Sequence, residues 1–223
     1  LACCGFTFLL GGGFVEMLLA FFGAGVGMYV RKKLLERHIT LLANVAAGVA
    51  AACVTYLLLF RLFEAVFSVS IVHQAGYICS MLFVIPGFPL ITGGIDLAKL
   101  DLRSGLERIT YAMLIIIMAT ITGWVVALLM HSYPADLSEP DMNPVLRCVL
   151  RLICSFCGVY GFSFLFNSKR KMAVCAGLIG MIANTVRLEL IDFTPVPAAV
   201  AAFIGAMLAG LMASAIKSHS GYP

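Results

Sequence analysis

The chain has 223 residues, of which 62% are hydrophobic and only 12% are charged. Soluble domains carry roughly 45–50% apolar and about 25% charged residues, and a mean hydropathy of +1.04 leaves too little polar surface to cover a soluble particle of this size. The net charge of +4 is therefore interpreted as membrane topology, and it gives no indication of nucleic-acid binding.

The apolar residues occur in eight runs, and most are close to the roughly 20 residues that a helix needs to cross the hydrocarbon core. In chain order, the predicted segments are 1–10, 14–30, 41–60, 71–94, 109–130, 145–166, 172–186 and 196–216. The first run has no Met and no signal-peptide pattern, so we expect a fragment of a longer segment. Because only helices satisfy all their backbone groups within one segment, the predicted fold class is all-α: a polytopic helical membrane bundle with about eight transmembrane segments.

The basic residues test this segmentation independently. Eleven of the 15 Lys and Arg residues fall on the side of the membrane that is reached by the loop after residue 30. The acidic residues lean toward the opposite side. This asymmetry is what the positive-inside rule expects, and it places the loop on the cytoplasmic side.

A short pattern near the start of the chain recurs in its second part. Gly5–Leu10 (GFTFLL) matches Gly161–Phe166 (GFSFLF), and looser matches follow each copy. An odd number of predicted segments separates the copies, so the second copy enters the membrane in the opposite orientation. Inverted repeats are typical of secondary transporters, whose substrate site lies between the halves. We predict a five-plus-five inverted repeat, with a first membrane repeat at 1–131 and an incomplete second repeat at 145–223.

The segment at 71–94 contains the strongest local signal, the run Ile85-Pro86-Gly87-Phe88-Pro89. Each proline lacks a backbone N–H and clashes with the preceding turn, and Gly87 adds flexibility. We expect the helix to open here, at a depth where open backbone is tolerated only beside protein or a water-filled cavity. Freed carbonyls and the N–H groups of the restarted helix would then suit a small solute with a carboxylate. The alternative is a simple proline kink.

Polar residues within other segments are further candidates. Glu16, near the outer end of its segment, is either a proton-coupling carboxylate or an anchor at the interface. Asn44 and Asn184 either contact the solute or form hydrogen bonds between helices. Thr122 either lines a pathway or bonds back to its own helix.

Some polar and cysteine residues carry no functional prediction. Arg147 and Arg151 lie one turn apart at the outer end of their segment, where interface anchoring is the simplest interpretation. Cys154 and Cys157 have the spacing of a redox or metal pair, but no second pair lies nearby, so we expect a structural role. The four His residues are too scattered to predict a metal cluster.

The residues that follow the Pro-Gly pair make a known pattern recognisable. They are Asp96-Leu97, Asp101, Gly105 and Arg108. This stretch resembles the signature of the bacterial threonine/serine exporter family: Pro-Gly, a short apolar stretch, Asp-Leu, an acidic residue, and then Gly and Arg opening the next helix. The turn at Leu10–Gly13 is similar to that family's first membrane hairpin, and residues from about 146 onward look like its second membrane half. The resemblance covers nearly the whole chain.

The resemblance implies a multi-pass secondary transporter of the bacterial plasma membrane, with ten helices, that exports threonine, serine or similar amino acids. It implies proton coupling, a small-molecule substrate, contact with lipid, and neither a cofactor, a metal nor an enzymatic activity; homo-oligomerisation stays open. The family's soluble N-terminal region and the last two helices have no counterpart in this sequence. Related two-subunit systems are thought to export dicarboxylates such as succinate, which is the alternative substrate class. A passive channel and a membrane assembly subunit are the alternative functions.

The sequence thus predicts three groups of site residues. The substrate-binding group is Pro86, Gly87, Thr92, Gly93 and Asp96; the coupling or gating group is Glu16, Asp101 and Arg108; the polar pathway group is Asn44, Thr122 and Asn184. The Thr92 hydroxyl is expected to meet the polar side chain of the solute. Asp96 is expected either to attract the solute ammonium or to hold its helix by pairing with Arg108.

Overall fold

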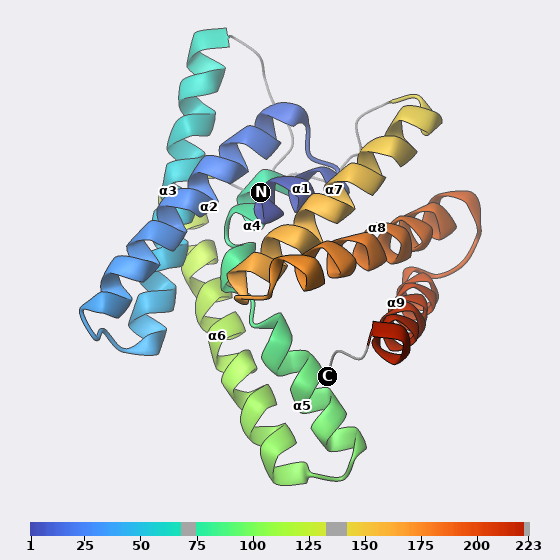
Figure 1. Ribbon diagram of the computed structural model, residues 1–223. Helices are drawn as coiled ribbons and strands as arrows, with labels where there is room; N and C mark the ends of the chain where they lie inside the picture. The colour runs from blue at the N-terminus through green and yellow to red at the C-terminus, as the bar shows by residue number, and fades with distance from the viewer. Residues whose placement is uncertain (68–74, 133–141, 221–223) are drawn as a thin grey trace. The chain divides into compact units, whose positions relative to one another are not determined.

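The structure is a computed structural model that describes residues 1–67, 75–132 and 142–220, with side chains up to residue 217. Every regular element in these ranges is a helix, as Figure 1 shows. In chain order they are α1 (Ala2–Leu9), α2 (Phe14–Glu36), α3 (Leu41–Phe67), α4 (Ala75–Ser80), η1 (Leu82–Val84), α5 (Gly87–Ala98), α6 (Leu102–Leu129), α7 (Pro144–Leu165), α8 (Arg170–Phe193) and α9 (Ala198–Ser220). The all-α polytopic bundle is confirmed.

Among the described residues, fewer helices than the eight expected segments have the length and hydropathy of a membrane span. Six of the described helices are long and apolar enough to cross a membrane, or seven if the bent pair formed by α4–η1 and α5 counts as one span. Helix α1 contains only 8 residues, well short of the roughly 20 that a span requires. The expectation of about eight spans is therefore not confirmed.

Several helices run further than the apolar segments that predicted them. Helix α2 continues to Glu36, α3 to Phe67 and α8 to Phe193. The added turns contain Arg, Lys and Glu, which are good helix formers. Hydropathy marks where the hydrocarbon core ends, whereas a helix can continue beyond it. Ile71, the expected start of the fourth segment, lies outside the described residues.

One compact unit comprises Gly12–Ser138 and contains α2 to α6. Its centre is the hairpin of α2 and α3, which lie side by side in Figure 1. A Cβ at Gly27 would lie 2.7 Å from both the Ala52 Cβ and the Gly48 carbonyl oxygen, and one at Gly23 would lie 3.0 Å from the Ala52 carbonyl. Small residues therefore let these two helices approach closely, as is common between membrane helices.

The other compact unit comprises Leu1–Gly11 and Glu139–Pro223, so it contains α1 with α7, α8 and α9. Helix α1 packs against α7, where the rings of Phe6 and Phe162 lie 5.6 Å apart. A Cβ at Gly5 would lie 2.6 Å from the Cys154 carbonyl oxygen. These compact units do not coincide with the predicted repeats, because α1 packs with helices of the second repeat. The repeat boundaries remain a prediction.

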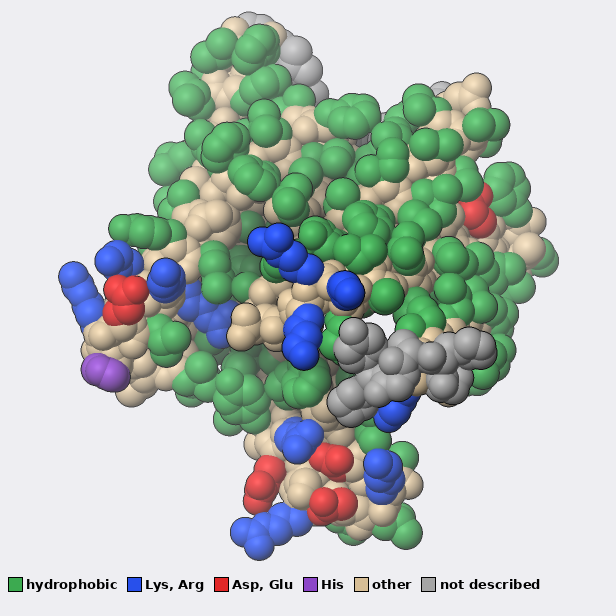
Figure 2. All heavy atoms as spheres, viewed as in Figure 1, with side chains coloured by type: hydrophobic (Ala, Val, Ile, Leu, Met, Phe, Trp, Pro, Cys, Tyr) green, Lys and Arg blue, Asp and Glu red, His purple; other side chains and the backbone are tan. Residues whose placement is uncertain are grey.

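Large apolar side chains are abundant on the surface. Figure 2 shows them covering much of the visible face, while Lys, Arg, Asp and Glu gather at the α2–α3 turn and at the α5–α6 turn, with further Lys and Arg side chains in the middle of the view. Trp124 and Leu129 of α6 are among the many large apolar side chains that remain exposed. Monomeric soluble proteins rarely expose such extensive apolar surface, so we assign it to contact with lipid.

Candidate functional site

The span expected to open at Pro86-Gly87 does so. Helix α4 is followed by the short 3-10 helix η1, and α5 restarts at Gly87 after an interruption at Ile85 and Pro86. The two parts of the span are bent by 66°. Because Ile85 is extended, with φ −62° and ψ 121°, the helix is interrupted as well as bent. The structure therefore supports an opened helix over a simple proline kink.

The backbone next to the break is accessible. The Gly87 N–H donates to the Ile85 carbonyl at 3.0 Å, and the Pro86 carbonyl accepts from the Leu90 N–H at 3.3 Å. Apart from neighbouring residues and the backbone of α5 itself, no atom of the described residues lies within 4 Å of the position where a Cβ at Gly87 would stand, and the same holds for Gly94. These positions thus leave open space in which a solute can approach the main chain.

Gly93 occupies a different environment from Gly87. It is the buried residue of α5, and a Cβ there would lie 2.9 Å from the Ile109 Cγ1 and 3.2 Å from the Gly105 carbonyl oxygen of α6. Gly93 therefore allows α5 and α6 to pack closely. Its role in substrate binding stays a prediction.

An open cleft lies between α5 and α6. It has a volume of about 310 Å³ and is lined by Phe88, Pro89, Thr92, Glu107, Arg108 and Tyr111. The Thr92 hydroxyl donates to the Phe88 carbonyl at 2.9 Å. Its hydrogen is therefore used within α5, but its oxygen can still accept a hydrogen bond from a solute.

The charged residues after the break form local pairs. The Asp96 Oδ2 lies 3.3 Å from the Arg108 Nε, which is the helix-holding pairing expected from the sequence. Asp101 caps α6, since its carboxylate accepts from the Ser104 N–H at 3.3 Å. The structure thus brings Thr92 and Arg108 to one cleft, with Asp96 beside them and Asp101 at the following helix start.

Glu16 lies at the start of α2. Its Oε2 accepts a hydrogen bond from the Gly13 N–H at 3.1 Å, which satisfies one of the free donors at the helix end. The residue is only 1% exposed. Its Oε1 has no hydrogen-bond partner among the described residues. This burial disfavours a simple anchor that reaches the interface, while the coupling role itself remains a prediction.

The three pathway candidates differ in their bonding. Asn44 of α3 is buried, and its Oδ1 has no hydrogen-bond partner in the described ranges. The Thr122 hydroxyl bonds back to the Met118 carbonyl at 2.8 Å, as one of the two interpretations expected. The Asn184 amide donates to the Ser155 hydroxyl at 2.8 Å and so joins α8 to α7. Their contact with a solute stays a prediction.

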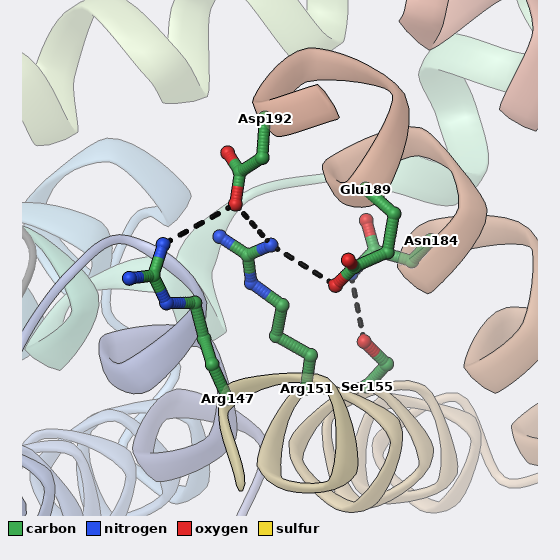
Figure 3. A network of polar contacts seen from close by, with 6 residues as sticks. All are labelled: Arg147, Arg151, Ser155, Asn184, Glu189 and Asp192. Carbon is green, nitrogen blue, oxygen red and sulfur yellow. Dashed lines mark hydrogen bonds and ion pairs between the residues drawn. The ribbon is translucent and has the colours of Figure 1, made fainter. Parts of the chain in front are cut away.

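A cluster of charged side chains joins α7 and α8, and the sequence did not reveal it. The Arg151 Nη1 lies 3.1 Å from the Glu189 Oε1 and 2.6 Å from the Asp192 Oδ2, as Figure 3 shows. The Arg147 Nη1 lies 3.4 Å from the same Asp192 oxygen. The Arg151 side chain is 4% exposed, so its interpretation as an interface anchor was wrong.

The missed cluster has a traceable cause. The predicted segment ended at residue 186, which placed Glu189 and Asp192 in an outer loop, whereas α8 continues to Phe193. Arg147 and Arg151 are four residues apart and Glu189 and Asp192 three, so each pair occupies one helix face. Matching these two spacings at adjoining helix ends was the signal that could have found the cluster.

The described ranges provide no support for a metal site or for a disulfide between Cys154 and Cys157. No group of three or more His, Cys, Asp or Glu residues is placed to hold a metal ion there. Cys154 and Cys157 are both free thiols, and Cys154 is buried, so this pair of cysteines forms no disulfide.

The long apolar helices, together with the helix pair bent at a break, define a multi-pass membrane protein with a cleft beside that break. Residues 1–131 match the family described as putative threonine/serine exporter. Residues 151–220 match a second family model, described as threonine/serine exporter. The chain belongs to the threonine/serine exporter family.

Two curated relatives are similar to part of the chain. The probable succinate transporter subunit YjjP of Escherichia coli (strain K12) is 34% identical over 128 residues, which cover 57% of this chain and 48% of the relative. The protein of the same description from Klebsiella aerogenes is 32% identical over 130 residues, which cover 58% and 48%. The chain thus spans about half the length of these relatives. No solved structure matches it.

Proposed function

We propose that the chain forms the membrane part of a secondary transporter that exports small amino acids, with threonine and serine as the first candidates. The transporter would lie in the bacterial plasma membrane and use the proton motive force. The observation that carries this proposal is the cleft beside the broken span. Broken membrane helices supply substrate groups in many secondary transporters, because both main-chain polar groups and a cavity are present at the same depth.

The cleft suits a zwitterion. Glu107 and Arg108 both line it and carry opposite charges, so they complement the ammonium and carboxylate of an amino acid. The Thr92 oxygen adds a hydrogen-bond acceptor for a solute hydroxyl. The volume of about 310 Å³ lies at the lower end of the range of small-molecule sites. Pro86 and Gly87 would supply main-chain groups, and Asp96 would position Arg108.

Proton coupling is assigned to Glu16. A carboxylate within a membrane span is costly and is by default a functional candidate. One of its oxygens caps α2 and the other has no partner in the described part of the chain. A proton on that second oxygen would remove a buried charge without breaking the cap.

A dicarboxylate such as succinate is the second candidate substrate. The two curated relatives are described as probable succinate transporter subunits. The word subunit in these descriptions also motivates a second proposal, that the chain acts in an assembly with other copies or other chains.

The inverted repeat of 1–131 and 145–223 is likewise proposed, and contacts within one compact unit support it. If Gly5 corresponds to Gly161, then Ala2 corresponds to Gly158. A Cβ at Gly161 would lie 2.9 Å from the Ala2 nitrogen, and one at Gly5 would lie 3.2 Å from the Gly158 nitrogen. Replacing each residue by its counterpart in the other copy turns the first contact into the second. A two-fold axis produces such reciprocal contacts.

Counterflow in proteoliposomes tests the proposed activity. Labelled threonine, serine and succinate are presented outside vesicles loaded with the unlabelled solute. We expect exchange of threonine and serine, and we expect an imposed proton gradient to drive net export. Flux that ignores the gradient would indicate a passive channel, and no flux of any of the three would indicate an assembly subunit.

The break itself is tested by Gly87→Leu, with Gly94→Leu as the matched control. At both positions an added Cβ would enter free space, but only Gly87 lies at the break. We expect Gly87→Leu to abolish most of the exchange while the control retains it. Equal exchange by both variants would show that the break takes no part in transport.

Coupling is tested by Glu16→Gln. The Gln oxygen can still accept from the Gly13 N–H, so the cap is retained while the titrating group is removed. We expect gradient-driven export to fall and equilibrium exchange to persist. An unchanged dependence of export on the proton gradient would exclude Glu16 as the coupling group.

A further inference from the structure

The charged cluster of α7 and α8 extends into a polar ladder that reaches the middle of both helices. We use "ladder" for Arg147, Arg151, Ser155, Asn184, Arg187, Glu189 and Asp192. Arg147, Arg151 and Ser155 follow each other at four-residue intervals on one face of α7. At 1.5 Å per residue they lie about 5, 11 and 17 Å from the start of that helix. Figure 3 shows the side chains of this face directed toward those of α8.

The charges of the ladder do not balance. It contains three Arg side chains but only two carboxylates. Glu189 and Asp192 both contact the buried Arg151, and Asp192 also contacts Arg147. Arg187 forms no ion pair with a described residue; its Nε donates to the Asn184 Oδ1 at 3.1 Å. Within the described part of the chain, one positive charge of the ladder therefore remains without a carboxylate.

Arg187 is held in place despite lacking an acidic partner. Asn184, which accepts from it, also donates to Ser155 of α7, so the amide is oriented by both neighbours. On the side of α9, a Cβ at Gly205 would lie 3.1 Å from the Arg187 Cβ. The stem of Arg187 is thus packed against α9, and the bond to Asn184 uses only its Nε. Arg187 is partly exposed, and no other hydrogen bond or ion pair joins its guanidinium to a described residue.

We propose that Arg187 binds a carboxylate of the transported solute, in a second site distinct from the α5–α6 cleft. Arg187 lies just past the apolar part of α8 and has no carboxylate partner among the described residues, and its planar fork matches a carboxylate in bidentate geometry. Glu189 and Asp192 neutralise Arg151, so they leave the charge of Arg187 to the incoming anion. This inference rests on the proposed function for the identity of the solute and adds where one carboxylate binds.

The test is direct binding to the purified protein in uncharged detergent. Labelled succinate and labelled threonine are titrated against the wild type, Arg187→Gln, Arg187→Lys and the control Arg170→Gln. Arg170 is the exposed first residue of α8, so its substitution removes the same charge outside the ladder. We expect Arg187→Gln to weaken binding by at least about tenfold, as for loss of a charge-assisted hydrogen bond. Arg187→Lys should be intermediate, because it keeps the charge and loses the fork.

Folding is monitored by the thermal midpoint of each variant. Because Arg187 has no carboxylate partner among the described residues, Arg187→Gln leaves no buried carboxylate unpaired. The thermal midpoint of this variant should therefore stay close to that of the wild type. Equal affinities for wild type and Arg187→Gln would overturn the proposal, as would the absence of binding of both solutes to the wild type. Equal weakening of binding by Arg170→Gln would also overturn it, because the lost affinity would then come from the overall positive charge of the protein and would not be specific to Arg187.

Failure of this inference is distinguishable from failure of the proposed function. Exchange in proteoliposomes with unaltered binding to Arg187→Gln would remove the Arg187 site and leave the transporter intact. Binding that depends on Arg187 in a protein without any flux would remove the transport proposal and leave the anion site.

Discussion

The helix pairs α5–α6 and α7–α8 are held together by different kinds of contact. Between α5 and α6 the contact is made by glycines: a Cβ at Gly93 would lie 3.2 Å from the Gly105 carbonyl, and one at Gly105 would lie 3.1 Å from the Gly93 carbonyl. Between α7 and α8 the contact is made by the buried Arg151 with two carboxylates. The first pair adjoins a break and an open cleft, whereas the second is cross-linked by charge.

This difference predicts different mechanical behaviour. The Asp96–Arg108 pair beside the cleft has side-chain exposed fractions of 23% and 48%, so it is only partly shielded from water and should open at little cost. Breaking a buried pair by removing one partner is far more costly. We expect α5 to move during transport while α7 and α8 move together, if they move at all.

The largest effect is expected from Arg151→Gln. It would leave Glu189 and Asp192 without their shared buried cation, at a cost of about 3–5 kcal/mol in the free energy of unfolding. Thermal unfolding of the purified protein in detergent measures it. Arg147→Gln is the control: its side chain is 27% exposed and Asp192 keeps its closer contact with Arg151. Comparable losses in the two variants would refute the view that Arg151 is the centre of the cluster.

The glycine contact is tested by Gly93→Ala. The added methyl would meet the Ile109 side chain and the α6 backbone, and such overpacking costs roughly 1–3 kcal/mol. Gly94→Ala, one residue along, enters free space and should be neutral or stabilising by up to about 1 kcal/mol, because Ala favours helix. If both variants have the same thermal midpoint, the α5–α6 contact is looser than the structure indicates.

A smaller effect is expected from Thr92→Val, which keeps the side-chain shape and removes the hydroxyl. Loss of one hydrogen bond with a solute hydroxyl costs about 1 kcal/mol, which corresponds to about a fivefold change in affinity. Competition counterflow should show weaker binding of serine and threonine, with alanine unaffected. Equal weakening of all three amino acids would mean that Thr92 shapes the cleft and makes no selective bond.

The sequence predicted the features that depend on local chemistry. Pro86 and Gly87 located the break, because proline removes a helix donor whatever surrounds it. The pairing of Asp96 with Arg108 was one of the two roles expected for Asp96, and the structure contains it. Apolar runs located every long helix but misplaced their ends, since hydropathy falls where the hydrocarbon core stops while α8 continues to Phe193.

Contacts between distant segments were beyond the sequence. Arg151 pairs with residues some forty positions away, and only its spacing from Arg147, matched by that of Glu189 and Asp192, distinguishes it from an arginine that faces the membrane interface. Likewise, Gly87 and Gly93 look alike in the sequence, yet one adjoins open space and the other packs against α6. Whether such a glycine is packed or open depends on tertiary contacts, which are known only from the folded structure.

The smallest effect on stability is expected from Asp96→Asn, and it separates a structural pair from a substrate contact. Because Asp96 and Arg108 are both partly exposed, their pair should contribute only about 0–1 kcal/mol to the free energy of unfolding. Glu36→Gln is the matched control, since Glu36 pairs with Lys33 at 3.4 Å on an exposed face away from the cleft. If Asp96 positions Arg108 for the solute, its variant should lose exchange in counterflow with almost no change in thermal midpoint, while the control keeps both. Exchange that survives Asp96→Asn would reduce this pair to a surface contact and would leave Arg108 without a positioning partner.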